Sequence, residues 1–417
     1  MKKPDKRYKL LLIAPGASDT DVGECYLAYK WIEQLSTHFD VTVLTLKLSD
    51  KLSIKSKNPN FVNIEFQDSG LFSKFERFSS MFKPWYISFY FKARRWIKQH
   101  GNEFDWAHQL NPFAMRYPTP LQGLSIPFSF GPMAGGLEDL SSFKQEMGSM
   151  AWYTQFRRLD NFRAKFDPLL GRGYRDANFI VVAAPYVADT LRYRYPQYPM
   201  KLLILDEHAV EGVHLRERGF NIGKDTKLRL LFVGRIVRTK GVRDLIRALN
   251  YLDFENYHLD VIGDGDDLRF CISEAQSMCL DDKITFHGKL ARDAVDSFYQ
   301  SSDLMVFPSF REPSGGVVIE AMANGLPQLV CDHGGPGASV KKSFGKKVPI
   351  SDPTNYPQDI AAEINEINLD RSVLKGMSEG SISYCRQNYL WQSKIEFFAG
   401  HLRSHIDKSK NTNIEST

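Results

Sequence analysis

The sequence predicts an α/β protein of two Rossmann-like domains that face each other across a cleft. The chain has 417 residues, which at roughly 100–200 residues for a domain is enough for two domains with a core each. Strand-like apolar runs alternate with helix-length segments in both halves of the chain. This alternation is typical of parallel sheets covered by helices on both faces, which bind ligands beyond the carboxyl ends of their strands.

The alternation is most regular in the second half of the chain. The loops that follow its strands are the places where binding or catalytic residues are expected. The expected strands are 228–234, 257–263, 283–288, 303–309 and 326–332, and the expected helices are 242–252, 268–280, 292–301 and 316–324.

The first half also begins with an apolar strand, which is followed by a polar loop containing glycine and by a helix over 24–36. Residues 202–215 carry few helix signals and are interpreted as the crossover between the domains. The last helix, over 390–405, has an apolar face of its own and is expected to pack back on the first domain. The expected strands are 9–14, 40–45, 61–66, 105–108, 127–130 and 178–183.

These elements define the expected domain boundaries. The first domain takes residues 1–205 together with the C-terminal helix 388–405, and the second takes 206–387. The tail 406–417 is polar, so it is expected to be disordered.

Composition and charge exclude several classes of protein. A hydrophobic content of 43% and a charged content of 25% are those of an ordinary globular protein. The five cysteines are odd in number, widely spaced and never in a C-x-x-C pair, which argues against a disulfide framework or a zinc site and fits a reducing cytoplasm. The net charge of +5 is too small to indicate a nucleic-acid partner.

The sequence predicts neither a signal peptide nor a transmembrane helix. The apolar run after the basic start, residues 10–13, is shorter than the roughly 7–15 residues of a signal peptide. Nowhere do about 18 apolar residues follow one another, which a transmembrane helix would need.

The most specific motif is the string R-E-P-S-G-G-V-V-I-E-A-M-A-N-G-L-P over residues 311–327. Glu312 lies in the loop after a strand, Gly315 and Gly316 open a helix, and Glu320 follows eight positions after the first glutamate. The free N–H groups at a helix start favour phosphate, and glycine lets a ligand approach the backbone. Either glutamate alone would equally suit the helix dipole, but the whole string favours an anion site flanked by two carboxylates that accept hydrogen bonds from hydroxyls.

A second motif follows the first strand of the second half, where a loop carries a cation at each end. Gly234 and Arg235 begin this loop, and Lys240 ends it. Arg grips phosphate through its planar fork and Lys acts as a point charge, so the pair would neutralise a diphosphate. Taken alone, the loop is better interpreted as a solvated basic loop.

Together these strings resemble the retaining GT-B glycosyltransferases of family four, also called glycosyl transferases group 1. The family's donor domain carries an E-x7-E motif like Glu312 to Glu320 and a G-R…K-G loop like Gly234 to Gly241. Weaker similarities lie at 261–265, 286–288 and 332–336, at the first glycine loop 21–24, and at 130–136, which is similar to a G-P-x-G-G-G string of one branch.

The resemblance implies a GT-B fold and a role for each matching residue. Glu312 would contact the hydroxyls of the donor sugar and Glu320 the ribose, while Arg235 and Lys240 hold the diphosphate. No metal and no cofactor are implied, because the nucleotide sugar is a co-substrate. In the usual view of this family, the acceptor attacks on the front face of the sugar and the leaving phosphate takes its proton. The other expected donor-binding positions are Gly23, Gly234, Gly265, His287, Gly315 and Gly316.

Two further residues are assigned by their context. His108 ends the strand 105–108, where the family often has a histidine near the reacting sugar. It is therefore expected to orient the donor or to stabilise charge, although a lone histidine is more often structural. The acidic cluster 264–267 is interpreted as a turn rather than a metal site, because Asp and Gly favour turns for backbone reasons.

This chain also departs from the family pattern at two positions. Gly316 stands where a larger apolar residue is more common, which alters the space near the donor sugar. Ala338 replaces a carboxylate that is often present. Both departures leave the identity of the donor open.

The segment 71–100 combines positive charge with aromatic residues. Its seven cations and one acid give a net charge of 7 − 1 = +6. This mixture suits an anionic membrane surface or a lipid-linked acceptor. Two core helices with buried aromatic faces would give the same pattern.

The expected function is hexosyl transfer from a UDP-sugar, with GDP as the alternative nucleotide, to a glycan or lipid-linked acceptor in bacterial surface polysaccharide synthesis. The enzyme would work in the cytoplasm, at the inner face of the membrane. A nicotinamide-dependent dehydrogenase is disfavoured, because the sequence lacks a G-x-G-x-x-G fingerprint after its first strand. A nucleotide-sugar epimerase and a non-catalytic sugar-nucleotide-binding subunit stay as alternatives.

Overall fold

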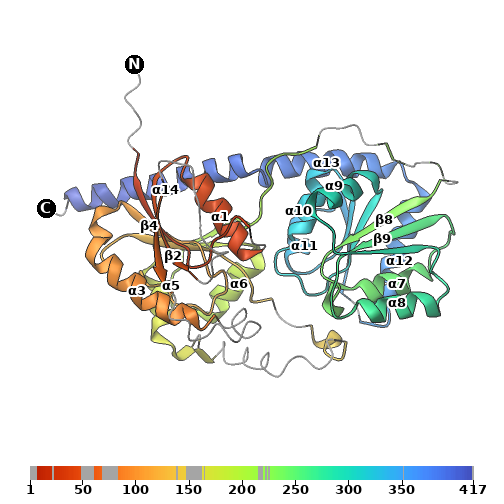
Figure 1. The fold of residues 1–417 in the computed structure, drawn as a ribbon, viewed down its shortest axis with the longest axis horizontal. Coiled ribbons are helices and arrows are strands. Elements are labelled where there is room, and N and C mark those ends of the chain that lie inside the picture. The colour runs from red at the N-terminus through yellow and green to blue at the C-terminus, as the bar shows by residue number, and fades with distance from the viewer. Residues whose placement is uncertain are drawn as a thin grey trace, which may run out of the picture. The chain divides into compact units, whose positions relative to one another are not determined.

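The computed structural model describes residues 7–20, 23–47, 61–67, 83–137, 140–146, 162–163, 165–214, 219–220, 223, 226–350 and 352–415. Within these ranges the chain forms two units of contacting residues (Figure 1). Unit 1 takes the described parts of Met1–Gly136, Gln155–Glu207 and Gln392–Thr417. Unit 2 takes those of Leu137–Thr154 and His208–Trp391. Each unit is a parallel sheet with helices on both faces.

Unit 1 contains a seven-stranded parallel sheet in the order β3-β2-β1-β4-β5-β6-β7. Its centre is apolar because Leu10–Ile13 of the first strand are fully buried. The strands are β1 (Lys9–Ile13), β2 (Asp40–Lys47), β3 (Phe61–Gln67), β4 (Trp106–Gln109), β5 (Phe128–Met133), β6 (Phe179–Val182) and β7 (Leu202–Ile204). The helices are α1 (Glu24–Leu35), α3 (Trp85–His100), α5 (Pro168–Asp176), α6 (Pro185–Arg194) and α14 (Trp391–Glu415), with 3₁₀ turns η1 (Gly101–Glu103) and η2 (Ser141–Phe143), the latter in unit 2.

Two expectations about the first domain are corrected here. Residues 202–215 were expected to be crossover only, but Leu202–Ile204 pair with β6 as the edge strand β7. The tail from residue 406 was expected to be disordered, but α14 continues to Glu415. Its last turns are held on unit 1 by a hydrogen bond from Tyr8 to Asp407 and an ion pair between Lys410 and Asp105.

Unit 2 contains a six-stranded parallel sheet in the order β10-β9-β8-β11-β12-β13. The strand order reverses between β8 and β11, which makes the carboxyl ends of these two strands the topological switch point where such sheets bind ligands. The strands are β8 (Leu228–Val233), β9 (Tyr257–Ile262), β10 (Ile284–Gly288), β11 (Leu304–Phe307), β12 (Gln328–Cys331) and β13 (Gly345–Val348). The helices are α7 (Val242–Leu249), α8 (Leu268–Ser277), α9 (Arg292–Ser301), α10 (Gly316–Ala323), α11 (Gly334–Ser339), α12 (Tyr356–Leu369) and α13 (Val373–Asn388), with the 3₁₀ turn η4 (Arg238–Lys240).

A short piece of the first half of the chain belongs to unit 2, although the sequence placed all of 1–205 in the first domain. The described residues 137 and 140–146 pack there because Phe143, which is fully buried, contacts Phe310 at a centroid distance of 4.5 Å and Tyr356 at 5.6 Å. Glu146 of the same piece forms an ion pair of 2.6 Å with Arg238.

Among the described helices none is long and apolar enough to cross a membrane.

Candidate functional site

The loops after β8 and β11 touch each other at the switch point of unit 2. A Cβ atom on Gly241, whose φ is +76°, would lie 2.3 Å from the carbonyl oxygen of Pro308. Only glycine therefore allows this approach, on grounds of both space and backbone conformation. The Ser309 hydroxyl donates to the carbonyl of Thr239 at 3.1 Å. The end of the first loop is thus fixed against the second.

The structure brings together two predicted site residues, one from each loop. Lys240 and Glu312 form an ion pair. Lys240 is 8% exposed, and its ammonium lies 5.7 Å from the centroid of the Phe307 ring. The other carboxylate oxygen of Glu312 accepts a hydrogen bond of 3.3 Å from the N–H of Ser314. An incoming phosphate would compete with Glu312 for the ammonium and release the carboxylate for hydroxyl groups.

The remaining cations of the first loop differ in their surroundings. Arg235, which was predicted to hold the diphosphate, is exposed. Arg238, which the sequence did not single out, donates to Glu146 at 2.6 Å and to Asp244 at 2.5 Å. Arg238 therefore anchors the loop, while Arg235 is accessible to a ligand.

The glycine pair opens α10 as predicted from the motif. Gly315 is the N-cap with φ +86°, in the left-handed region that favours glycine. The first N–H groups of an α-helix have no acceptor within it and attract anions. The late glycine loop supports this turn, because the N–H of Gly335 donates to the carbonyl of Glu312 at 2.9 Å.

Glu320 lies one turn further along α10 and has two partners from α9. Its carboxylate accepts a hydrogen bond of 3.2 Å from the Tyr299 hydroxyl and forms an ion pair of 3.3 Å with Arg292. Burial raises the pKa of Glu320, against the opposing effects of Arg292 and Tyr299. Neither partner was predicted, since nothing in the local sequence of α9 indicates that it faces α10.

Gly234 and Gly265 serve the contact between the β8 and β9 loops. A Cβ atom on Gly265 would lie 2.3 Å from the carbonyl oxygen of Ile236. The N–H of Gly234 donates to Ile262 at 3.0 Å, and the N–H of Ile236 donates to Asp264 at 2.9 Å. Both glycines thus shape the edge of the site through the backbone, and their contact with a donor stays a prediction.

The acidic cluster 264–267 forms a turn before α8. The N–H of Gly265 donates to Asp264 at 2.7 Å, and Asp267 accepts from Arg243 at 2.9 Å. These contacts are those of the turn that the sequence predicted.

His287 lies at the end of β10, beside the same edge of the sheet. Its Nε2 lies 2.7 Å from a carboxylate oxygen of Asp260, and its ring packs edge-on against Phe298 at 4.6 Å. The predicted contact between this residue and a nucleotide base stays a prediction.

His108 belongs to unit 1 and does not reach a surface. Its side chain is fully buried, with Nε2 2.9 Å from the carbonyl oxygen of Gly131 and Nδ1 2.8 Å from the hydroxyl of Ser129. Burial lowers the pKa of His108 to about 3, so the ring is neutral, donates from Nε2 and accepts at Nδ1. The ring therefore ties β4 to β5, and the predicted role of His108 in orienting the donor or stabilising charge would act through its neighbours and stays a prediction.

Gly23, also in unit 1, precedes α1 with φ +65°, and a Cβ atom there would meet none of the described residues within 4 Å. The next residue, Glu24, accepts from the N–H of Phe113 at 3.0 Å and from Lys83 at 2.6 Å. The predicted contact of Gly23 with a donor stays a prediction.

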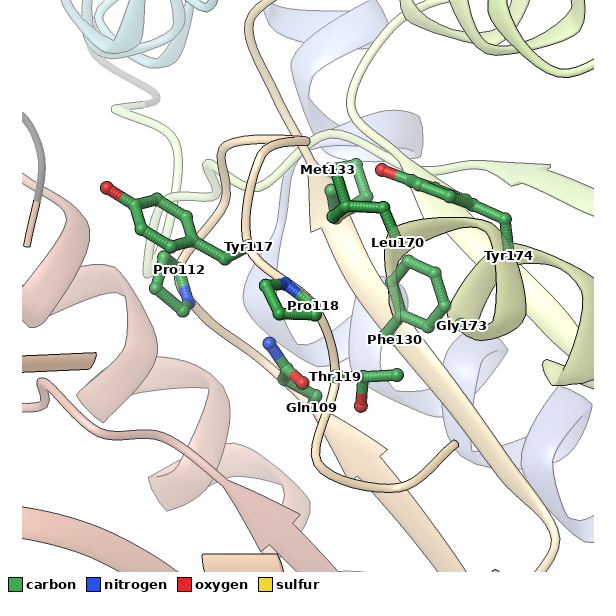
Figure 2. Close-up of a pocket in the computed structure, with 10 residues that line it drawn as sticks. All are labelled: Gln109, Pro112, Tyr117, Pro118, Thr119, Phe130, Met133, Leu170, Gly173 and Tyr174. Carbon is green, nitrogen blue, oxygen red and sulfur yellow. The ribbon is translucent and has the colours of Figure 1, made fainter. Parts of the chain in front are cut away.

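A small pocket lies at the carboxyl ends of β4 and β5 (Figure 2). Gln109, which is 4% exposed, lines it. Its Nε2 donates to the Tyr86 hydroxyl at 3.2 Å, whereas its Oε1 has no hydrogen-bond partner among the described residues. The other lining residues are Pro112, Tyr117, Pro118, Thr119, Phe130, Met133, Leu170, Gly173 and Tyr174.

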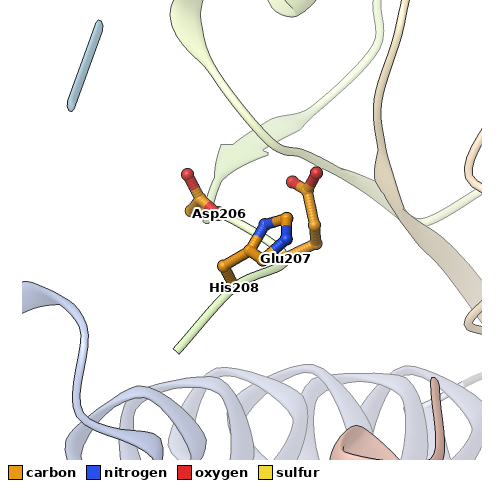
Figure 3. Close-up of side chains that lie close together, drawn as sticks. All are labelled: Asp206, Glu207 and His208. Carbon is orange, nitrogen blue, oxygen red and sulfur yellow. The ribbon is translucent and has the colours of Figure 1, made fainter. Parts of the chain in front are cut away.

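One group of metal-ligand types occurs among the described residues, where the chain leaves β7 (Figure 3). Asp206, Glu207 and His208 offer one ligand atom each within 4.8 Å of one another. Their proximity follows from their being consecutive in the chain. The group contains no residue of the acidic turn 264–267, and the predicted metal independence stays a prediction.

Comparisons with known proteins find similarity over the part of the chain that carries this site. Residues 216–383 match the family model described as glycosyl transferases group 1. The chain is 36% identical over 126 residues to an uncharacterized glycosyltransferase of Methanocaldococcus jannaschii, covering 30% of this chain and 32% of that protein. It is 33% identical over 201 residues to mannosylfructose-phosphate synthase of Agrobacterium fabrum, covering 43% of each. The chain thus spans less than half the length of these curated relatives.

Solved structures show that the whole chain has the GT-B fold. Sucrose-phosphate synthase from Thermosynechococcus elongatus superposes with a TM-score of 0.64 at 17% identity, covering 96% of this chain and 100% of that one. HepE of Anabaena, solved in complex with UDP and glucose, gives 0.61 at 14% identity, with coverage of 95% and 100%. Both matches extend over the two units.

Proposed function

We propose that this chain, whose residues 216–383 belong to the glycosyl transferases group 1 family, is a retaining, metal-independent hexosyltransferase that uses a nucleotide diphosphate sugar. The observation that carries the proposal is the meeting of Lys240 and Glu312 at the switch point, beside the start of α10. This arrangement supplies a cation, an anion-binding helix start and two carboxylates within one unit.

Each of these residues would contact a different part of the donor. Lys240, Arg235 and the first N–H groups of α10 would hold the diphosphate. Glu312 would accept hydrogen bonds from sugar hydroxyls, and Glu320 from the ribose. Electrostatic stabilisation of the phosphate would be the main contribution of the protein to the rate.

The reaction would proceed on one face of the sugar. The acceptor hydroxyl forms a bond to the anomeric carbon while the bond from that carbon to the phosphate oxygen breaks. The departing phosphate takes the electron pair and the proton of the hydroxyl. Attack and departure on the same face retain the configuration, and no side chain needs to become covalently attached.

UDP is the proposed nucleotide. It is supported by the Anabaena HepE structures, which were solved with UDP and with UDP-glucose. For the acceptor we propose a glycan or lipid-linked sugar in bacterial surface polysaccharide synthesis. Support comes from similarity to the lipopolysaccharide outer core galactosyltransferase WaaB, with a TM-score of 0.65 at 14% identity and coverage of 95% and 99%.

Location at the inner face of the cytoplasmic membrane is also proposed, and α3 supports it. Residues 71–82 of the basic aromatic segment lie outside the described residues. On α3, Tyr86 and Phe89 are buried, whereas Ile87 and Phe91 are each 64% exposed. The outward face thus combines these two apolar residues with the exposed cations Lys92, Arg95 and Lys98, which suits anionic headgroups.

One assay separates the proposed activity from its alternatives. The protein is incubated with UDP-glucose, UDP-galactose or UDP-N-acetylglucosamine, and both the free UDP and the sugar nucleotide are quantified. A transferase with weak hydrolysis releases UDP. An epimerase returns a different UDP-sugar and no UDP, and a non-catalytic subunit binds the donor but releases nothing.

A further inference from the structure

Gly316 is the glycine that departs from the family pattern. Another residue occupies the space that a side chain at this position would need. A Cβ atom on Gly316 would lie 2.6 Å from Cδ2 and 2.8 Å from Nε2 of His208. Cβ atoms do not approach other heavy atoms this closely, so any side chain here would displace the imidazole. The Cδ2–Nε2 edge of His208 therefore packs on the first residue of α10.

The backbone around His208 is held on unit 2 by neighbouring residues. The N–H of Val210 donates to the carbonyl of Tyr389 at 2.8 Å, and the carbonyl of Val210 accepts from Trp391 at 3.0 Å. The N–H of His214 donates to the carbonyl of Ala323 at 2.8 Å. The half-buried ring, drawn in Figure 3, is thus presented to α10 by a segment anchored on the same unit.

The face of α10 that His208 covers is the face that carries the proposed donor contacts. Residues four apart in a helix lie on one face, so Gly316 and Glu320 are neighbours there. The electrostatic effect of His208 reaches the Glu320 carboxylate. The imidazole therefore lies against the anion-binding start of α10, whose next turn carries the carboxylate assigned to ribose.

We propose that His208 is a donor-binding residue whose Nε2 donates a hydrogen bond to the diphosphate of the nucleotide sugar. The inference rests on the proposed function, because it assigns a further residue to the same site. An imidazole donates through one nitrogen when neutral and through both when protonated. The absence of a side chain at Gly316 makes room for this ring, so the two positions act as a pair.

A matched pair of variants tests the hydrogen bond. His208→Gln keeps an N–H donor on a chain of similar reach, whereas His208→Met fills similar space without a donor. Loss of a hydrogen bond to a charged group weakens affinity about tenfold. The Met variant should therefore bind UDP about tenfold more weakly than the wild type. The Gln variant should recover most of that loss. Calorimetric titration with UDP measures both, and the melting temperature without nucleotide reports on the fold.

A second set of variants tests the pairing of positions. Gly316→Ala should weaken UDP binding strongly when His208 is present and have little further effect in the His208→Ala background. Gly376→Ala is the control, because a Cβ atom on this α13 glycine would lie within 4 Å of no residue in the described part of the chain. The control should bind UDP as the wild type does.

The outcomes separate the inference from the proposed function. If the wild type binds neither UDP nor GDP, the proposed function fails and the inference falls with it. If the wild type binds UDP and His208→Met binds equally well, only the role of His208 is overturned. Equal effects of Gly316→Ala with and without His208 would likewise contradict the pairing.

Discussion

At the scale of single residues, the Lys240–Glu312 ion pair links donor binding to transfer. We expect Glu312→Gln to lower the transfer rate by at least about a hundredfold, the usual effect of losing a group that stabilises the transition state. UDP affinity should stay equal or rise, because the ammonium of Lys240 then lacks its competing carboxylate. Steady-state kinetics and UDP titration measure the two quantities. Near-normal turnover would show that Glu312 is not a site residue.

Replacing the other partner of the ion pair, Lys240, should affect UDP affinity instead. Lys240→Ala removes the buried cation and leaves Glu312 facing the diphosphate, so UDP binding should weaken by at least about tenfold. Arg238→Ala serves as a comparison, because Arg238 is hydrogen-bonded to Glu146 and Asp244. This substitution should lower the melting temperature rather than the affinity for UDP. Equal UDP affinity of Lys240→Ala and wild type would remove Lys240 from the donor site.

His108 makes a prediction about pH. Its pKa is about 3 in the fold and about 6.5 when exposed, so the unfolded chain binds the extra proton between these values. Stability from this group is therefore complete above pH 6.5 and is lost as the pH falls toward 3, by at most about 1.4 kcal/mol for each pH unit. The free energy of unfolding, measured with urea at several pH values, should fall less steeply with decreasing pH in His108→Gln than in the wild type. Parallel slopes would contradict the assigned environment.

The predicted site residues that the structure brings together lie in motifs: Lys240 and Glu312 form an ion pair, and Glu320 lies on the helix that follows Glu312. It missed Arg292 and Tyr299, because their partner Glu320 is distant in the chain and helix α9 has no motif. The burial of His108 could not be predicted, because a histidine at the end of a strand has the same local pattern whether it faces a ligand or the core. Only the contacts with Ser129 and Gly131 distinguish the two.

At the scale of elements, α3 tests the membrane proposal. Arg95 and Lys98 are exposed on its outward face, and each cation near an anionic surface contributes about 1 kcal/mol of attraction. The variant Arg95→Gln/Lys98→Gln should therefore sediment less with vesicles rich in anionic lipid, and salt should release the wild type. UDP binding should be unchanged, because the proposed donor contacts Lys240, Glu312 and Glu320 lie in unit 2.

Arg94 is excluded from that variant, since it donates to the carbonyls of Pro120 and Gln122 and its loss would affect the fold. A control with Asp189 and Arg192 of α6 both changed to Ala alters exposed charges elsewhere on unit 1 without changing its net charge. If this control and the α3 variant sediment alike, the outward face of α3 is not the binding surface.

The central strands of both sheets could be predicted because they are continuous apolar runs. Of the edge strands that the structure describes, β3 and β10 were predicted, but β7 and β13 were missed for a physical reason. β13, Gly345–Val348, contains two lysines, as edge strands often do to avoid pairing with other chains, and β7 has only three residues. The end of α14 was missed because its polar turns are held by Tyr8 and Asp105, which are far away in the sequence.

At the scale of the whole molecule, the metal-free mechanism is the first prediction. The diphosphate charge would be met by Lys240, Arg235 and the start of α10, so transfer should continue at an unchanged rate after treatment with EDTA. The measurement is UDP release from the donor before and after chelation. Loss of activity on chelation, restored by a divalent ion, would overturn the metal-free mechanism and direct attention to Asp206, Glu207 and His208.

The two-domain architecture was predictable, but the assignment of residues 137 and 140–146 to unit 2 was not. Phe143 and Glu146 reach their partners Phe310 and Arg238 across a large separation in sequence. The local sequence pattern does not reveal such long-range contacts, so it groups this piece with its neighbours in the chain.

The most direct test of the central claim, that unit 2 holds a nucleotide sugar at its switch point, is a titration of UDP into the wild type and into Glu320→Ala with EDTA present. We expect the wild type to bind UDP, with a gain of about 2.7 kcal/mol in stability at a hundred times Kd, and Glu320→Ala to bind at least about tenfold more weakly through loss of the ribose contact. Equal affinity of the two proteins, or no binding of UDP or GDP by the wild type, would contradict the claim.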